Sequence, residues 1–114
     1  MKILLIILFL LINSHNLFAN PQICSWIIDE PFKEYQEEAK DQHAAFYVVV
    51  SDGECEYGMT IGENSEEKAK KAAFKDCEKW RKENKISGKC EPFAVNDKFI
   101  WENVAFVTND EGER

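Results

Sequence analysis

The sequence predicts an α+β domain with the element order α-β-β-α-β-β, in which an antiparallel sheet of about four strands carries a long helix on one face. Three observations support this class. Two apolar stretches, residues 44–50 and 55–61, are joined by an Asp-Gly pair. Residues 64–84 are rich in helix-forming residues, and residues 90–101 contain two further short strand patterns.

An export signal precedes the domain. Met1-Lys2 gives a charged start, residues 3–12 are an uninterrupted apolar run, and residues 13–19 turn polar and end in a small residue. This order is typical of a secretory signal peptide, and the run is shorter than the roughly 20 residues that span a bilayer. We therefore expect residues 1–19 to be a signal peptide, cleaved within a few residues of position 19, and the mature protein to be secreted or periplasmic.

The rest of the chain divides into an N-terminal extension (20–28), a single α+β domain (29–108) and a polar tail (109–114) that we expect to be disordered. Of the 114 residues, 95 remain after a signal of 19, and they carry 13 basic and 21 acidic residues. Their net charge of −8 argues against nucleic acid and anionic membranes as general partners. No further transmembrane segment is expected after removal of the signal.

The first helix is expected over residues 29–42. Acidic residues precede Pro31 there, which is typical of a helix start with proline in the first turn. Phe32, Tyr35 and Ala39 recur at helical spacing and give this helix one apolar side.

The two apolar stretches form a hairpin around the Asp52-Gly53 turn. This turn predicts the register: Val50 opposite Cys55, Val48 opposite Tyr57, Phe46 opposite Met59, and Ala44 opposite Ile61. All eight side chains are apolar and share one face, and a slip of one residue would scatter them. The other face carries Tyr47 and Val49, which the first helix is expected to cover unless a partner does.

The second helix is expected to begin at a cap around Asn64-Ser65 and to end before the turn at Ser87-Gly88. Five residues at helical spacing share one side of it: Ala69, Ala73, Cys77, Trp80 and Asn84. The opposite side carries a lysine stripe: Lys68, Lys71, Lys75, Lys79 and Lys82. The stripe is either the solvated face of an amphipathic helix, or a surface that binds an anionic envelope polymer or an acidic protein.

Two short strands are expected at 90–95 and 98–101, joined by a tight turn at Asn96-Asp97, and residues 104–107 could add another. Pro92 lacks a backbone N–H, so it should lie at a strand end or where no ladder hydrogen bond is needed. Because the long helix returns along the second strand, the third strand runs antiparallel to the first. The apolar first strand then lies in the centre, and the expected order across the sheet is 2-1-3-4.

The four cysteines, Cys24, Cys55, Cys77 and Cys90, all follow the signal peptide. None forms a C-x-x-C motif and their spacing suits no zinc ribbon or finger, so an oxidising compartment predicts two disulfides rather than a metal site. We favour Cys77–Cys90, which closes a short loop and is worth about 3 kcal/mol. Cys24–Cys55 would be the second pair, and Cys55–Cys77 remains geometrically open.

A motif of the form S-x-x-x-A-x3-A-x3-C begins at Ser65, and Cys90-Glu91-Pro92-Phe93-Ala94-Val95 follows it before a turn and Phe99-Ile100-Trp101. This pattern resembles a group of small exported bacterial domains of unknown function, over roughly residues 32–101. The resemblance implies an exported bacterial α+β module with a disulfide from helix to strand, and it implies no known reaction. Cys24 and Cys55 are not part of the pattern.

No motif in the sequence is typical of catalysis or of cofactor binding, so we expect a non-enzymatic module without cofactor or metal. Its function would be binding, or an accessory role in the cell envelope, with a protein or envelope component as partner. The candidate surfaces are the lysine stripe and the pair Tyr47 and Val49. An alternative is a secreted inhibitor or antagonist of an enzyme, acting through residues 85–89 before Cys90. A small hydrolase is the third hypothesis, and it requires His43 within reach of a reduced cysteine or a buried carboxylate.

Overall fold

The computed structural model describes residues 23–101 together with residues 106 and 107, so the predicted signal peptide (1–19) and polar tail (109–114) lie outside the described residues. The elements in chain order are β1 (Ile23–Cys24), α2 (Ser25–Ile27), the π-helix η1 (Ile28–Phe32), α3 (Lys33–Glu38), β2 (His43–Ser51), β3 (Glu54–Glu63), α4 (Glu66–Glu83), β4 (Glu91–Val95), β5 (Lys98–Phe99) and β6 (Phe106–Val107). Among the residues that the structure describes, no helix combines the length and the apolar character that crossing a membrane needs.

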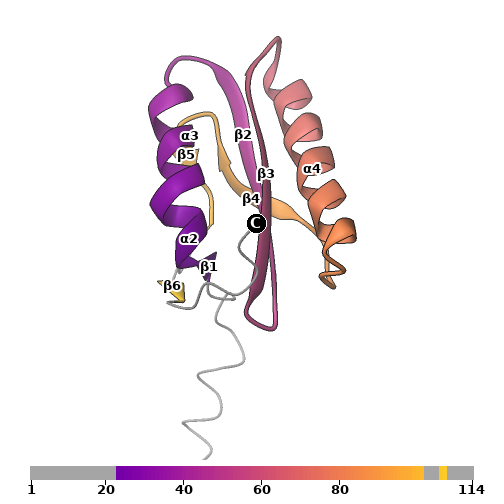
Figure 1. The fold of residues 1–114 in the computed structure, drawn as a ribbon. Helices are drawn as coiled ribbons and strands as arrows, with labels where there is room; N and C mark the ends of the chain where they lie inside the picture. The colour runs from indigo at the N-terminus through magenta and orange to yellow at the C-terminus, as the bar shows by residue number, and fades with distance from the viewer. Residues whose placement is uncertain (1–22, 102–105, 108–114) are drawn as a thin grey trace, which may run out of the picture.

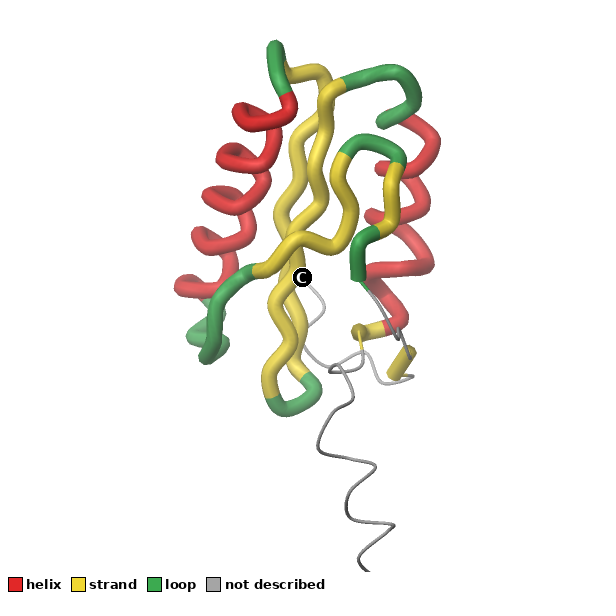
Figure 2. The backbone as a smooth tube through the Cα atoms, turned by 180° about the vertical axis from the view of Figure 1, so that it is seen from behind, coloured by secondary structure: helices red, strands yellow, loops and turns green. Residues whose placement is uncertain are grey.

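Helices lie on both faces of a central sheet (Figure 1). The four main strands are antiparallel to their neighbours and follow the order β3-β2-β4-β5, while β1 and β6 form a separate parallel pair. The segment α2-η1-α3 lies on one face of the sheet and α4 on the other, as the view from behind also shows (Figure 2). These features confirm the predicted α+β class, with a four-stranded antiparallel sheet and a helix packed on it.

Asp52 and Gly53 form the turn between β2 and β3, with φ values of 52° and 80°. Positive φ at both central residues is what a type I′ hairpin turn requires. The register predicted from this turn is confirmed, with Val50 opposite Cys55, Val48 opposite Tyr57, Phe46 opposite Met59, and Ala44 opposite Ile61. The turn therefore decides which side chains of the two strands share a face.

The face of the sheet that carries Phe46 is covered by the segment α2-η1-α3. Phe32 from η1 contacts Phe46 and Phe93 edge-to-face, with ring centroids 5.2 and 4.8 Å apart, and Tyr57 stacks on Phe46 at 5.2 Å. Phe46 and Phe93 are both completely buried. This face is thus filled by large aromatic side chains that interlock, and we call it the aromatic face.

The opposite face carries Tyr47 and Val49, and α4 covers it. The prediction that the first helix covers these two side chains is wrong, although their cover is part of the same chain, as expected. Gly58 on β3 explains the choice, because a Cβ atom there would lie 2.1 Å from the backbone N of Cys77 and 2.6 Å from the carbonyl O of Ala73. Only a helix with a stripe of small residues can approach the sheet so closely, and we call this the close-packed face.

The first helical segment begins at Ser25 rather than at Asp29, and Pro31 lies within the π-helix η1 instead of in a first turn. The missing N–H of proline removes one helical hydrogen bond, and a π turn is one way for a helix to continue past such a gap. The earlier start follows from burial, because Ile23 and Ile27 are completely buried in the aromatic cluster.

β4 pairs with β2 through one irregularity in the register. Ala94 lies opposite Phe46, but Pro92 lies opposite Tyr47, so Phe93 is an extra residue on β4. Pro92 is the second residue of the strand and lies next to this irregularity, as expected of a residue that cannot donate a ladder hydrogen bond. Phe93 is thereby free to fill the aromatic face.

Asn96 joins three parts of the molecule at the turn between β4 and β5. Its φ is 55°, its N–H donates to the carbonyl of Ala44 at 2.7 Å, and its side-chain Oδ1 accepts from the Ala44 N–H at 3.1 Å. The Tyr35 hydroxyl donates to the Asn96 carbonyl at 2.6 Å, and burial raises the pKa of this tyrosine well above its ordinary value. The predicted turn therefore also ties α3 to the sheet.

Candidate functional site

The structure contains two disulfides, and no described cysteine is free. Cys24–Cys55 joins the N-terminal segment to the hairpin, and Cys77–Cys90 joins α4 to the residue before β4. The domain is therefore small and braced by disulfides. The Cys77–Cys90 bond closes the connection between α4 and β4, and an open groove lies beside that connection.

Residues 84–90, which we call the braced loop, begin where α4 ends. Lys85 has a φ of 56°, the left-handed conformation that usually follows the last residue of a helix. Its N–H donates to the carbonyl of Lys82 at 3.2 Å, and the N–H of Ile86 donates to the carbonyl of Arg81 at 3.0 Å. This pair of hydrogen bonds is a Schellman motif, so α4 ends at its own cap, before the predicted turn at Gly88.

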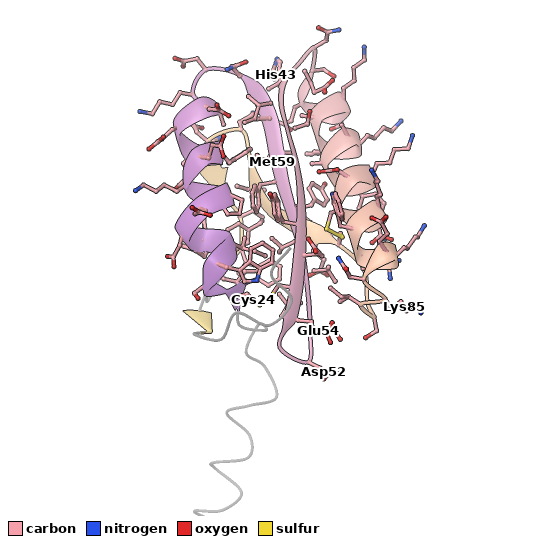
Figure 3. The ribbon with its side chains drawn as sticks, in the orientation of Figure 1. Cys24, His43, Asp52, Glu54, Met59 and Lys85 are labelled. Atoms are coloured by element: carbon pink, nitrogen blue, oxygen red, sulfur yellow. A yellow bond between two sulfur atoms is a disulfide. The ribbon has the colours of Figure 1, made fainter. Side chains whose placement is uncertain are left out.

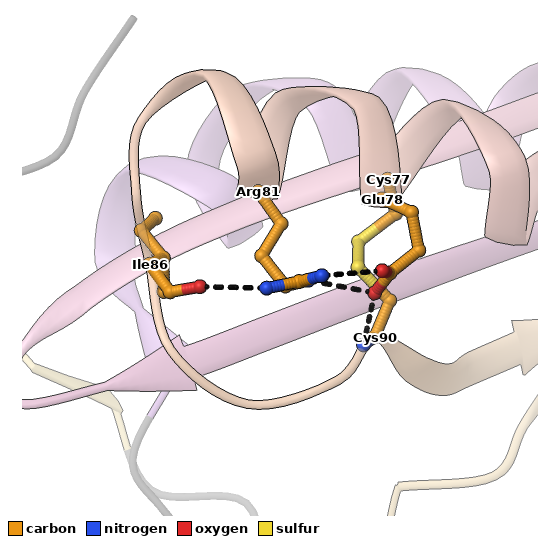
Figure 4. A network of polar contacts seen from close by, with 5 residues as sticks. All are labelled: Cys77, Glu78, Arg81, Ile86 and Cys90. Carbon is orange, nitrogen blue, oxygen red and sulfur yellow. Dashed lines mark hydrogen bonds and ion pairs between the residues drawn. A yellow bond between two sulfur atoms is a disulfide. The ribbon is translucent and has the colours of Figure 1, made fainter.

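A carboxylate and a guanidinium hold the braced loop from inside (Figure 4). Arg81 donates to both carboxylate oxygens of Glu78, at 2.8 and 2.7 Å, and to the carbonyl of Ile86 at 3.0 Å. Glu78 also accepts from the backbone N–H of Cys90 at 3.0 Å. The hydrogen bonds from Arg81 hold the pKa of Glu78 below its ordinary value, against the opposing effect of burial, and the Cys90 N–H adds to this lowering.

Two further contacts fix the middle of the loop. Ile86 is 3% exposed and packs with Val49 and Cys77, while the hydroxyls of Ser51 and Ser87 lie 2.7 Å apart. Within the loop, Ile86 and Cys90 are buried and the other residues are exposed. The exposed residues at its outer end are Ser87, Gly88 and Lys89.

Beside the braced loop lies an open groove of about 500 Å³ between α4 and β4, which we call the α4–β4 groove. It exists because α4 lies mainly over β3 and β2 and has few contacts with β4. Its lining comes from β2, α4, the braced loop and β4: Tyr47, Glu67, Lys70, Lys71, Phe74, Lys89, Cys90, Glu91 and Pro92.

The floor of the groove is aromatic. Tyr47 and Phe74 meet edge-to-face with their ring centroids 6.0 Å apart, and the ammonium of Lys89 lies 5.7 Å from the centre of the Phe74 ring. Burial raises the pKa of Tyr47, an effect that Lys70 opposes and Glu67 supports. The Tyr47 hydroxyl is therefore protonated at neutral pH and can donate a hydrogen bond.

The three lysines of the groove differ in their partners. Lys70 forms ion pairs with Glu66 and Glu67, each at 3.5 Å, and the negative charge of Glu67 raises the pKa of Lys70. Within the described part of the chain, Lys71 and Lys89 take part in no ion pair. Among the described residues, the groove therefore offers two ammonium groups that form no ion pair, Lys71 from α4 and Lys89 from the braced loop.

The structure places the predicted surface residues in different surroundings. The lysine stripe (Lys68, Lys71, Lys75, Lys79 and Lys82) is exposed along α4, and only Lys71 reaches the groove. Tyr47 lies in the groove, but Val49 is 3% exposed beneath the braced loop and cannot form a surface. Lys70 and Phe74 were not predicted as surface residues, and Lys89 was predicted only as part of the 85–89 segment of the inhibitor hypothesis. Their convergence on one groove depends on where α4 lies across the sheet.

The residues that a hydrolase would need are far apart. His43 is exposed and lies opposite Glu63, and Figure 3 shows it at the other end of the molecule from Lys85 and the hairpin tip. Glu56 is completely buried on β3, where it accepts from the Asn84 amide at 2.8 Å. It lies seven residues along β3 from Glu63, which is about 23 Å. No group of described side chains is arranged to hold a metal ion.

Comparison of the chain with models of protein families, with curated proteins and with solved structures finds no match.

Proposed function

We propose that this protein is an exported, non-enzymatic module that binds a protein partner through the α4–β4 groove and the adjoining braced loop. The observation that carries the proposal is the convergence on one groove of Tyr47 from β2, of Phe74 and Lys71 from α4, and of Lys89 from the braced loop. An apolar floor with a few polar groups around it is the usual composition of a binding site.

Export is supported by the signal-like start of the sequence and by the two disulfides, because such bonds persist in oxidising compartments. The periplasm and the extracellular space both satisfy this condition. We also propose a relationship to the small exported bacterial domains that share the helix-to-strand cysteine pattern of Cys77 and Cys90.

The rigidity of the braced loop favours binding. Its backbone is held by the Cys77–Cys90 disulfide, by Glu78 and Arg81, and by buried Ile86 before any partner arrives. A surface that is already ordered loses less conformational entropy when it binds, so more of its contact energy appears as affinity.

The test is capture of partners by the full chain, expressed with its export signal and immobilised after purification. We expect a saturable partner that is lost when Lys71 and Lys89 are both changed to Glu. The matched control is the double change of Lys75 and Lys79 to Glu, which alters the charge by the same amount on the exposed stripe of the same helix. A partner lost equally with both pairs, or no partner from any exported fraction, would contradict the proposal.

A second candidate function is inhibition of an enzyme, which the braced loop favours by itself. Rigid, exposed loops anchored at both ends can occupy an active site without being reordered. Because Lys85 and Lys89 are its exposed basic side chains, secreted proteases that cleave after lysine are the first targets to assay. Inhibition that disappears with Lys89→Ala but survives Lys75→Ala would support this function, and no inhibition at micromolar protein would contradict it for that protease class.

A further inference from the structure

The donors of the α4–β4 groove select for a negative charge. The Lys71 and Lys89 ammoniums have no carboxylate partner within the described residues, and the Tyr47 hydroxyl makes no hydrogen bond there. All three groups can donate to a carboxylate oxygen, and hydrogen bonds to ionised groups are the stronger kind. The groove is therefore better equipped for an acidic group than for a neutral or basic one.

The floor of the groove selects for an apolar group beside that charge. The Phe74 ring, the Tyr47 ring and Pro92 form it, and their polar atoms are few. A ligand side chain placed on this floor removes apolar surface from water, which contributes about 25 cal/mol per Å². The volume of about 500 Å³ lies within the roughly 300–1,000 Å³ of ordinary ligand pockets, so it admits a short segment rather than a single ion.

The two glutamates of the groove argue against a polyanion. Glu67 is paired with Lys70, but Glu91 takes part in no ion pair within the described residues, and both line the groove. A polymer with a negative charge on every unit would bring further charges against Glu91, and like charges at short range repel. A segment with one acidic group can place it at Lys71 and Lys89 and keep its other units neutral.

We infer that the α4–β4 groove binds a peptide segment in which one acidic residue stands beside an apolar or aromatic one. The carboxylate lies between Lys71 and Lys89 and accepts from the Tyr47 hydroxyl, and the apolar side chain lies on Phe74 and Pro92. This inference rests on the proposed function and deepens it, because it states what the protein partner presents to the groove.

The experiment titrates the ¹⁵N-labelled protein with blocked peptides that carry the pairs Phe-Glu, Phe-Gln, Phe-Lys and Ala-Glu, and follows amide shifts. We expect Phe-Glu to shift the amides of Tyr47, Phe74 and Lys89, and Phe-Gln and Ala-Glu to bind at least about tenfold more weakly. Lys71→Gln with Lys89→Gln should abolish the preference of Phe-Glu over Phe-Gln. The matched control, Lys75→Gln with Lys79→Gln, should preserve it.

Phe74→Leu tests the floor with little change of volume, and thermal unfolding of this variant checks that the domain remains folded. It should weaken the binding of the Phe-Glu peptide and leave its preference over the Phe-Gln peptide intact.

Alginate and polyglutamate, titrated in the same way, test the alternative of a polyanion. Equal binding of the Phe-Glu and Phe-Gln peptides, or tighter binding of either polymer than of the Phe-Glu peptide, overturns the inference. If no peptide binds while partner capture still requires Lys71 and Lys89, the peptide inference fails and the proposed function stands. If partner capture does not depend on these two lysines, the proposed function fails as well.

Discussion

The two faces of the sheet are packed by opposite means. The aromatic face is filled by large rings from η1, β2, β3 and β4, and the close-packed face is filled by bringing the backbone of α4 against Gly58. On the aromatic face, the packing contacts are distributed over many side chains. On the close-packed face, they are concentrated on the small residues of α4, so α4 leaves β4 largely uncovered and the α4–β4 groove forms there.

This difference predicts that the two faces fail in opposite ways. Removing volume should damage the aromatic face, whereas adding volume should damage the close-packed face. The braced loop belongs to the close-packed side, since Ile86 and Cys90 pack with Val49 and Cys77. Smaller changes in the loop should therefore affect the end of α4 and leave the aromatic face intact.

The largest effect is expected for Phe46→Ala. Phe46 is completely buried, and the centroid of its ring lies within 6 Å of the ring centroids of Phe32, Tyr57 and Phe93. Loss of the ring leaves a cavity among side chains that cannot all move inward, and truncations of this kind cost about 3–5 kcal/mol of unfolding free energy. Denaturant unfolding measures the change. A cost below about 1 kcal/mol would show that the aromatic face is not the main source of stability.

The next effect is expected for Gly58→Ala, which adds one methyl group to the close-packed face. The new Cβ would overlap the backbone of Cys77, and a backbone atom cannot turn aside as a flexible side chain does. We expect a loss of about 3 kcal/mol as α4 is displaced. The control is Gly62→Ala, where the nearest atom is the flexible end of Gln42 at 3.1 Å and the cost arises from a φ of 86°. Equal losses from the two substitutions would contradict the close approach of α4.

The expectations from sequence succeeded where local chemistry decides the outcome. The Asp52-Gly53 pair decides the turn and hence the register of the hairpin, and the run of helix formers decides α4. The assignment of helices to faces was wrong because both faces of β2 are apolar. The two faces differ in one respect: Gly58 leaves room on one of them for the small residues of α4. This contact joins parts of the chain that are distant in sequence, so local patterns do not reveal it.

The groove was predicted only in part for the same reason. Lys71 and Tyr47 were found because one belongs to a visible stripe and the other to an apolar strand face. Phe74 gave a usable signal, since it lies three residues after Lys71 and so on the same side of the helix. Lys89 lies in the 85–89 segment that the inhibitor hypothesis named, but its position over Phe74 was not predicted, because that position follows from the disulfide and the Schellman motif.

Glu78→Gln should have an intermediate effect that depends on pH. The hydrogen bonds from Arg81 lower the pKa of Glu78 in the folded protein, so the ionised carboxylate contributes stability above the ordinary pKa of glutamate. That contribution is lost as pH falls through the lowered value. We expect the substitution to cost about 2 kcal/mol at pH 7 and little in strong acid, because hydrogen bonds to ionised groups are worth about 1.5–3 kcal/mol. Unfolding curves measured across pH provide the comparison, and a cost independent of pH would exclude the ionised network.

The smallest effect is expected for Lys85→Gly, and it should be stabilising. Lys85 holds a φ of 56° at the end of α4, which costs a residue with a Cβ atom roughly 1–2 kcal/mol relative to glycine. Glycine also gives the unfolded chain more conformational freedom, which offsets part of this stabilisation. We therefore expect a net increase in the unfolding free energy of about 0.5 kcal/mol. Lys85→Ala removes the same side chain but keeps the Cβ atom, and it should give no increase. If both substitutions change the unfolding free energy equally, the side chain of Lys85 matters and its backbone conformation does not. If only the glycine variant is stabilised, the backbone of the braced loop is strained at Lys85, and the other contacts of the loop hold it in that conformation.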